Sequence, residues 1–193
     1  ASGQHNVRLI KPMYEPYVQQ IVVHDGKTVS ISPKLVPAFV TVTLRAVPGS
    51  EIWVNGEYKG TEKWSGDLSK GACLFEVRKL GHRAAYLSRD LDSTSPMTLN
   101  LPEPEPIYGK LIVNSTPAMA IVEIAGMALQ ETPVIVSKML IGSHEVRIRK
   151  SGYQDYVTTV SVSEGKTAEI NATLTKIADS TNGSTMKWSD YIV

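Results

Sequence analysis

Histidine side chains recur at a fixed place in this chain, and histidines at matched places can hold a metal ion. His5 and His144 both stand in the pattern Gly-x-His-x-Val, and Cys73 holds the equivalent place in a third segment. Zinc requires three or four ligands that converge on one point. These side chains instead share the inward parity of Val7 and Val146, which predicts histidines at the buried start of a strand with hydrogen bonds to the backbone. We therefore expect no metal site and no bound cofactor.

Nucleophilic catalysis finds no suitable set of residues in the sequence. Cys73 is the single cysteine and has no dedicated histidine beside it, and the carboxylates are scattered over turns and outward strand positions. The sequence contains no Gly-x-Ser-x-Gly stretch and no phosphate-binding loop. A single cysteine also excludes an internal disulfide. We expect no enzymatic activity and no catalytic residue.

Three aromatic residues, Trp53, Tyr58 and Trp64, gather around one Asn-Gly hairpin, whereas the related stretch 121–129 contains no aromatic residue. Flat aromatic side chains on a loop can stack against sugar rings or cover a protein hot spot. Alternatively, Trp53 and Trp64 pack against a neighbouring repeat, which we favour because small domains must bury their large apolar side chains. The three residues are the candidate ligand-binding residues.

A repeated unit must position these residues, because residues 3–35 recur without a gap at residues 142–174. The two copies share 14 identical residues, which in the first copy are Gly3, His5, Val7, Arg8, Lys11, Tyr14, Tyr17, Val18, Val23, Gly26, Lys27, Thr28, Ile31 and Leu35. A more divergent copy runs from Gly71 to Leu101, and the stretches ahead of the second and third copies also resemble each other. The chain therefore consists of two and a half repeats, and its fold follows from one repeated unit.

Apolar residues alternate with polar residues almost throughout, which is the pattern of half-buried strands. In the last copy the alternation predicts strands over residues 143–149, 156–162 and 167–174, with a hairpin turn over 163–166. Asn55-Gly56 predicts another hairpin. No segment has a sustained helical stripe. Short strands between frequent turns predict an all-β fold, a tandem of small antiparallel β-sandwiches.

Proline-rich and polar stretches divide the chain into four segments. We expect half a repeat over residues 1–37, complete repeats over 38–103 and 107–176, and a linker over 177–193 that ends in a solitary strand, residues 186–193. The proline-rich stretch between the two complete repeats predicts a short, stiff spacer, because proline cannot continue a ladder and favours an extended conformation.

The third copy carries motifs in a recognisable order. Residues 109–174 contain Gly-x-Leu-x-Val, Pro-x-x-Ala, Val-x-Ile-x-Gly, Thr-Pro and Gly-x-His-x-Val-x-Ile-x-Lys-x-Gly-Tyr. This order resembles the PEGA domain, a small β module named for a Pro-Glu-Gly-Ala stretch, which here is Pro117-Ala118-Met119-Ala120. The resemblance implies PEGA-like repeats with an Ig-like or prealbumin-like sandwich fold. It also implies a bacterial or archaeal envelope or surface protein, and it carries over no catalytic residue.

Charge and hydropathy limit the partners. The chain has 20 lysine and arginine residues against 19 aspartate and glutamate residues, so a net charge of +1 provides no strong field for nucleic acid or anionic lipid. No stretch approaches the roughly 18 apolar residues of a spanning helix. We expect no nucleic-acid partner and no membrane insertion. The resemblance implies an extracytoplasmic location, in the periplasm or at the cell surface, through a signal upstream of this chain.

The leading hypothesis for function is a non-enzymatic structural and interaction module that spaces or presents neighbouring domains of an envelope or surface protein. Its expected partners are those domains or other envelope proteins. The alternative is carbohydrate or peptidoglycan binding through the aromatic residues of the second repeat. A cytoplasmic accessory module beside a kinase or sensor is a third hypothesis.

The half repeat predicts an unsatisfied surface. Residues 3–35 supply about three strands without the strands that open a repeat, which leaves an apolar face and a backbone edge uncovered. We expect other β structure to complete it, either residues 186–193 of the same or another molecule, or a neighbouring copy. Strand-mediated self-association would follow the main-chain pairing of β-augmentation.

Overall fold

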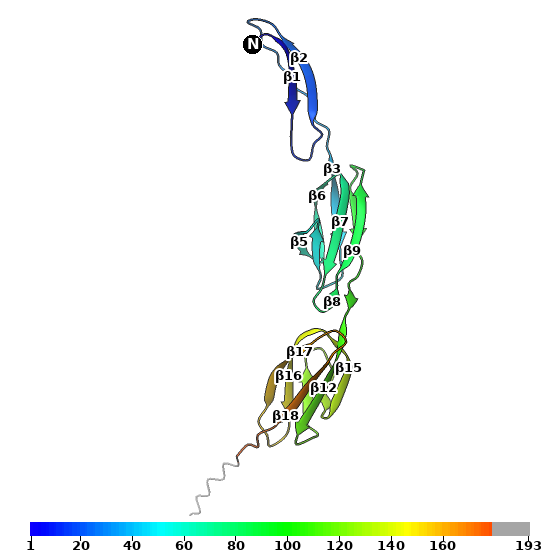
Figure 1. Ribbon diagram of the computed structural model, residues 1–193, viewed down its shortest axis with the longest axis vertical. Coiled ribbons are helices and arrows are strands. Elements are labelled where there is room, and N and C mark those ends of the chain that lie inside the picture. The colour runs from blue at the N-terminus through cyan, green and yellow to red at the C-terminus, as the bar shows by residue number, and fades with distance from the viewer. Residues whose placement is uncertain (179–193) are drawn as a thin grey trace, which may run out of the picture. The chain divides into compact units, whose positions relative to one another are not determined.

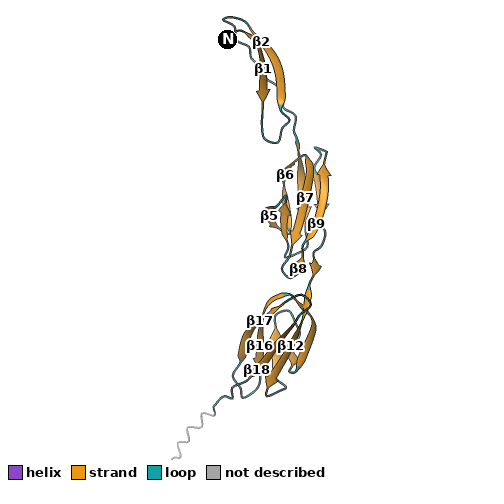
Figure 2. Cartoon of the chain, in the orientation of Figure 1, coloured by secondary structure: helices purple, strands orange, loops and turns teal. Residues whose placement is uncertain are grey.

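The computed structural model describes residues 1–178, and those residues form strands, turns and loops without any helix (Figure 2). The chain divides into two compact units, Ala1–Pro106 and a second unit that begins at Ile107. The described residues include no helix that could cross a membrane. The all-β fold is therefore confirmed. The solitary strand predicted over residues 186–193 lies outside the described residues.

The second repeat is a sandwich of two sheets. One sheet has the order β10-β3-β6 and the other has the order β5-β4-β7-β9. Their strands are β3 (Phe39–Arg45), β4 (Glu51–Val54), β5 (Glu57–Thr61), β6 (Lys63–Ser69), β7 (Gly71–Arg78), β9 (Ala85–Leu91) and β10 (Met97–Asn100). Alternate side chains of the two sheets meet in one core, whose fully buried members include Val42, Ile52 and Phe75.

The third repeat has the same architecture. Its sheets are ordered β15-β12-β18 and β14-β13-β16-β17. The strands are β12 (Tyr108–Thr116), β13 (Ile121–Ile124), β14 (Gln130–Glu131), β15 (Val134–Leu140), β16 (Gly142–Arg149), β17 (Tyr156–Val162) and β18 (Thr167–Thr173). Each strand takes the place of its counterpart in the second repeat, from β12 for β3 to β18 for β10 (Figure 1). A tandem of sandwiches with one strand order is therefore confirmed.

Each sandwich contains one parallel pair, which corrects the expectation of wholly antiparallel sheets. Strand β10 runs parallel to β3, and β18 runs parallel to β12. The turn over residues 163–166 is therefore not a hairpin turn. It carries the chain from β17 in one sheet to β18 in the other, with Gly165 at φ 64°. The hairpin predicted at Asn55-Gly56 does join two paired strands, β4 and β5.

The half repeat forms two strands, β1 (Gly3–Leu9) and β2 (Tyr17–Val23), which pair with each other from Gly3↔Val23 to Leu9↔Tyr17. The expected third strand is absent, since residues 27–36 belong to no ladder. Its counterpart in the complete third repeat, β18, forms a strand because it pairs with β12. Residues 1–37 contain no counterpart of β12, so the same sequence pattern has nothing to pair with.

Short pairings occur at the ends of the second repeat. Strand β8 (His82–Arg83) pairs with β11 (Glu105–Pro106) in a separate two-stranded sheet, so the end of the predicted spacer forms a short ladder despite its prolines. At the other end, Tyr14 pairs with Pro37, and the backbone N–H of Ala38 donates to the carbonyl of Met13 at 2.8 Å. The rings of Tyr14 and Phe39 meet edge to face at 5.9 Å between centroids.

Candidate functional site

The outward face of the four-stranded sheet in the second repeat carries a row of side chains that crosses all four strands. Trp53 on β4 stands opposite Tyr58 on β5 and Glu76 on β7, and Glu76 stands opposite Tyr86 on β9. We call Tyr58, Trp53, Glu76 and Tyr86 the cross-strand row. Side chains directly opposite on one face of a sheet lie close enough to interact.

Strand alternation places this row on the outside. Ile52 and Val54 point into the core with 0% and 2% exposure, so Trp53 between them must point outward. Phe75 and Val77 are fully buried and impose the same outward direction on Glu76. The row is thus a direct consequence of the residues that build the core.

Trp53 is held on three sides. Its ring meets that of Tyr58 edge to face, with centroids 5.5 Å apart and planes at 63°. Its Nε1–H donates to Glu51 Oε2 at 3.1 Å. The guanidinium carbon of Arg78 lies 4.1 Å from the ring centroid, within the range of cation–π attraction. Trp53 is half-buried as a result, whereas Tyr58 keeps half of its surface exposed.

Glu76 connects the two halves of the row. It accepts from Arg78 Nε at 2.6 Å and Arg78 Nη2 at 3.0 Å, and the Tyr86 hydroxyl donates to it at 3.3 Å. The hydrogen bond from Arg78 lowers the pKa of the Glu76 carboxyl, although partial burial opposes the shift. The same bond raises the pKa of Arg78. Arg78 therefore serves both as the carboxylate's partner and as the cover of Trp53.

Trp64 does not join this row. It lies on β6 in the opposite sheet, opposite Leu44, and packs against the core of its own repeat. Its ring lies over Gly66, where an added Cβ would come within 2.5 Å of the ring. The structure thus brings together two of the three predicted ligand-binding residues, Trp53 and Tyr58, and places the third in the packing of the sandwich. The expectation that Trp64 packs against a neighbouring repeat is therefore wrong, because the core of its own repeat takes up its ring.

The third repeat carries two charged residues and a valine where the second repeat carries Trp53, Glu76 and Tyr86. Glu123 takes the place of Trp53, Arg147 that of Glu76, and Val157 that of Tyr86, by the matching registers of the two sheets. Arg149 there pairs with Glu123 at 3.1 Å and with Asp155 at 3.3 Å. An exposed aromatic cluster on this face is therefore specific to the second repeat among the two complete copies.

The matched histidines bind the backbone, as predicted. His144 Nε2 is hydrogen-bonded to the carbonyl of Leu140 at 2.7 Å, and His5 Nε2 to that of Ala1 at 2.9 Å. The prediction that both are buried is wrong: His144 is half-buried, and His5 is exposed because no sheet within residues 1–178 covers β1 and β2. Within residues 1–178, no three metal-ligating side chains gather.

Cys73 holds the matching place in the second repeat. Burial raises the pKa of its thiol, and a hydrogen bond with Asn55 and the charge of Lys59 lower that pKa by smaller amounts.

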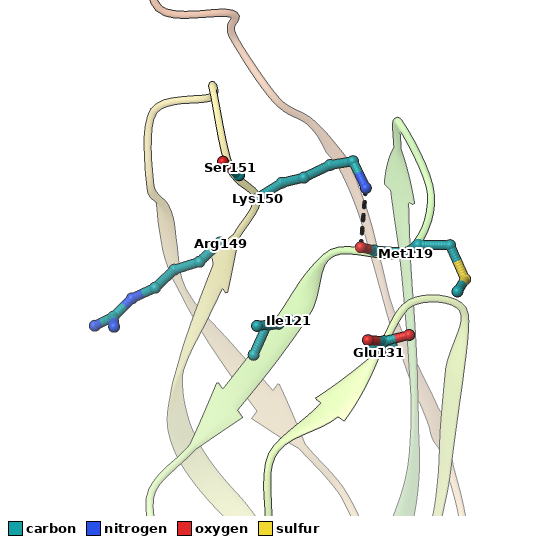
Figure 3. Close-up of a pocket in the computed structure, with 6 residues that line it drawn as sticks. All are labelled: Met119, Ile121, Glu131, Arg149, Lys150 and Ser151. Carbon is teal, nitrogen blue, oxygen red and sulfur yellow. Dashed lines mark hydrogen bonds between the residues drawn. The ribbon is translucent and has the colours of Figure 1, made fainter.

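A shallow hollow of about 470 Å³ lies at one end of each complete repeat. In the third repeat it is lined by Met119, Ile121, Glu131, Arg149, Lys150 and Ser151 (Figure 3). Lys150 Nζ donates to the carbonyl of Met119 at 2.9 Å (Figure 3). It also donates to the carbonyl of Ala118 at 2.8 Å, so the ammonium group closes the proline loop. In the second repeat Lys79 and Arg78 line the equivalent hollow. Its presence in both copies marks it as a property of the fold.

Sequence reasoning missed Glu51, Glu76, Arg78 and Tyr86, which complete the surroundings of Trp53. The available signal was strand parity, because Glu76 and Arg78 alternate with the apolar Phe75 and Val77. Parity gives the direction of each side chain. It does not give the register that sets Glu76 between Trp53 and Tyr86.

Comparison with solved structures finds chains of low sequence identity. The TIE protein of Bacillus anthracis aligns at 12% identity and a TM-score of 0.45, over 91% of this chain and 42% of that chain, so this chain spans about two fifths of it. The minor pilin GBS52 of Streptococcus agalactiae aligns at 12% identity and a TM-score of 0.37, over 72% and 97% of the two chains. A streptococcal ancillary pilin aligns at 11% identity and a TM-score of 0.29, over 89% and 75%.

No curated protein matches the sequence. The PEGA domain family, in contrast, matches residues 1–38 and 108–178, which are the half repeat and the third repeat. The second repeat between them has the strand order of the third. The chain belongs to the PEGA domain family.

Proposed function

We propose that this chain is a non-enzymatic, extracytoplasmic structural module that spaces or presents neighbouring domains of an envelope or surface protein. The observation that carries the proposal is that each complete repeat has a full hydrophobic core of its own, built on the same strand order. Membership of the PEGA family supports the location and the structural role.

Separate cores suit a spacer for a physical reason. The buried core residues of the second repeat lie between Val40 and Leu101, and those of the third lie between Leu111 and Leu174. Such modules can be placed in series without one depending on another, and a proline-rich joint between them resists compaction. The length of the series then sets how far a neighbouring domain stands from its attachment.

The repeat offers its own test. In the protein that carries this chain, deletion of residues 38–103 is expected to reduce antibody access to an epitope in the neighbouring domain on intact cells. Replacement of residues 38–103 by a second copy of residues 107–176 is expected to restore access, because the third repeat supplies an equivalent sandwich without the cross-strand row. A replacement that behaves like the deletion would contradict the spacer role and assign the function to residues specific to the second repeat.

Binding of carbohydrate or peptidoglycan is the second candidate, and the exposed aromatic surface of the cross-strand row favours it. Tyr58 has half its surface open, whereas Arg78 covers a face of Trp53. The two rings meet at 63°, so a sugar would stack on Tyr58 and touch Trp53 at its side. This arrangement provides one stacking ring and a flanking indole, with Trp64 on the opposite sheet.

Co-sedimentation with insoluble peptidoglycan and with polysaccharide tests this candidate. If the row binds glycan, Tyr58→Ala and Trp53→Glu should each abolish retention, and Trp53→Glu installs the residue that the third repeat carries. Glu123→Ala, at the matching place in the third repeat, is the control and should leave retention unchanged. Equal sedimentation of all four proteins would exclude the aromatic row as a glycan site.

A further inference from the structure

Strands β1 and β2 form a hairpin (Figure 1). One face of this hairpin is apolar, and its counterpart is buried in both complete repeats. Val146 and Ile148 on β16 are fully buried, and Val162 on β17 has 3% exposure. Their matches in the half repeat are Val7, Leu9 and Val23, all of which are only half-buried. No residue from Ala1 to Phe39 is fully buried.

The covering layer of a complete repeat is known from the structure itself. In the third repeat Leu111, Val113, Val136 and Met139, from β12 and β15, supply the other side of the core over β16 and β17, and β12 pairs with β18 in their own sheet. Residues 107–140 therefore show what kind of segment would cover the apolar face of β1 and β2. It is a pair of strands with alternating apolar side chains, followed by a glycine.

The free edge of β1 also has a known partner in each complete repeat. In the third repeat β13 pairs with β16 from Ile124↔Val146 to Ile121↔Arg149. The second repeat uses the same edge of β7, from Val54↔Phe75 to Glu51↔Arg78. The matching edge of β1 is residues 7–10, and within residues 1–178 the only strand paired with β1 is β2. An uncovered face and an unpaired edge together fit the strands of a first half repeat.

The backbone around Gly3 keeps the path that joins the two halves of a complete repeat. Gly3 has φ 126°, against 114° for Gly71 and 129° for Gly142, which directly follow the last strand of each first half. His5 Nε2 also bonds to the carbonyl of Ala1 as His144 Nε2 bonds to that of Leu140, the last residue of β15. Ala1 thus occupies the place of Leu140, the last residue of β15.

We propose that the face of Val7, Leu9 and Val23 and the edge of β1 bind the first half of a PEGA repeat, which enters through Ala1 along the path of β15. Residues 1–37 and that segment then form one complete sandwich. In it residues 27–36 gain the parallel partner that β18 has in β12, and they become a strand. This goes beyond the spacer role, because it assigns an interaction surface and the chemistry of its occupant.

The test adds the missing layer to the full chain. Residues 107–139 are joined ahead of Ala1, so that Ala1, Ser2 and Gly3 take the places of Leu140, Ile141 and Gly142. Amide exchange of residues 7–10 and 27–36 is expected to slow at least tenfold in a fused protein whose solution mass is that of its monomer. The matched control carries the same added segment with Leu111→Asp and Val113→Asp in the added copy only, and its exchange in these residues should equal that of the parent chain.

Three results would overturn the proposal. The first is an added segment that leaves the exchange of residues 7–10 and 27–36 as it was. The second is a parent chain that is already dimeric with these residues protected, which would make a second copy the occupant. The third is a monomeric parent chain whose protection disappears when residues 179–193 are deleted, which would make its own tail the occupant. Should the fused protein fail to fold, the same segment added as a separate peptide gives the same readout.

Discussion

Single positions in the two complete repeats show how one backbone serves different chemistry. Ser50 and Ala120 occupy the same place after the proline loop, and both are fully buried. The Ser50 hydroxyl has no hydrogen-bond partner, although its backbone N–H and carbonyl are both bonded. Thr132, the other fully buried hydroxyl residue, accepts from the backbone N–H of Ala120 at 3.0 Å. A buried hydroxyl without a hydrogen-bond partner destabilises the folded state, whereas a hydrogen-bonded hydroxyl stabilises it.

Ser50→Ala is therefore expected to stabilise the second repeat by about 1 kcal/mol, because it removes an unsatisfied polar group and leaves the residue that the third repeat uses. Thr132→Val is the contrasting variant and should destabilise the third repeat by about 2 kcal/mol, since it leaves the Ala120 N–H unpaired. Denaturant unfolding measures both values. A loss of stability in Ser50→Ala similar to that in Thr132→Val would show that the Ser50 hydroxyl has a partner in solution.

Glu76 makes the stability of the second repeat depend on pH. Its pKa is lowered in the folded protein by the hydrogen bond from Arg78, so the folded state favours the carboxylate. The resulting stabilisation is complete above the ordinary glutamate value of about 4.3 and is lost as the pH falls through the lower folded value.

Acid titration of unfolding should show this loss in the wild-type second repeat, and Glu76→Gln should make its stability less dependent on pH below about 4.3. Glu145→Gln, at an exposed carboxylate of the third repeat, is the control and should leave the titration of the second repeat unchanged. An identical acid dependence in wild type and Glu76→Gln would assign it to other carboxylates.

The alternation of apolar and polar residues predicts where the strands lie, but it does not predict which strands pair with each other. The expected strands over residues 143–149, 156–162 and 167–174 differ from β16, β17 and β18 by a residue at most. The parallel pairing of β18 with β12 was missed, because alternation is the same in parallel and antiparallel strands. Thr28 and Ile31 match Thr167 and Ile170, yet only the latter lie in a strand. A β-strand forms only when a neighbouring strand pairs with it, and here that neighbour is distant in sequence.

Gly109 lies where β12 passes under the turn that connects β17 to β18. A Cβ added there would lie within 2.7 Å of Val162 Cγ1 and 3.0 Å of the Lys166 carbonyl oxygen, and closer still to the Ser163 carbonyl oxygen. Backbone atoms cannot move aside as a flexible side chain can. Gly109→Ala is therefore expected to destabilise the third repeat by about 3 kcal/mol, by the cost of overpacking a close contact.

Thermal unfolding of Gly109→Ala, compared with the exposed variant Ser151→Ala, measures this effect. The transition of the third repeat should fall while that of the second repeat stays in place. Equal transition temperatures in the two variants would contradict the close approach of β12 and the 163–166 turn.

At the scale of the whole molecule, the duplication could be found from the sequence alone, and the candidate site only in part. Trp53 and Tyr58 were identified by their place on one hairpin, and the structure brings them together. Trp64 stands close to them in sequence but lies in the other sheet, because the chain crosses between sheets after β5. Whether two neighbours in sequence share a face depends on such crossings, which alternation does not encode.

The central claim is that each complete repeat is a module that folds by its own core, as a spacer requires. Val42 on β3 and Val113 on β12 are both fully buried, each in the core of its own repeat. Loss of two methyl groups from such a site costs about 2 kcal/mol. Separate modules should make these losses independent and additive.

The most direct measurement is equilibrium unfolding followed by amide exchange in each repeat, for Val42→Ala, Val113→Ala and the double variant. The account predicts that Val42→Ala lowers the free energy of unfolding of the second repeat alone, that Val113→Ala lowers that of the third repeat alone, and that the double variant shows both losses unchanged. A Val42→Ala protein in which the third repeat loses as much protection as the second would contradict independent modules.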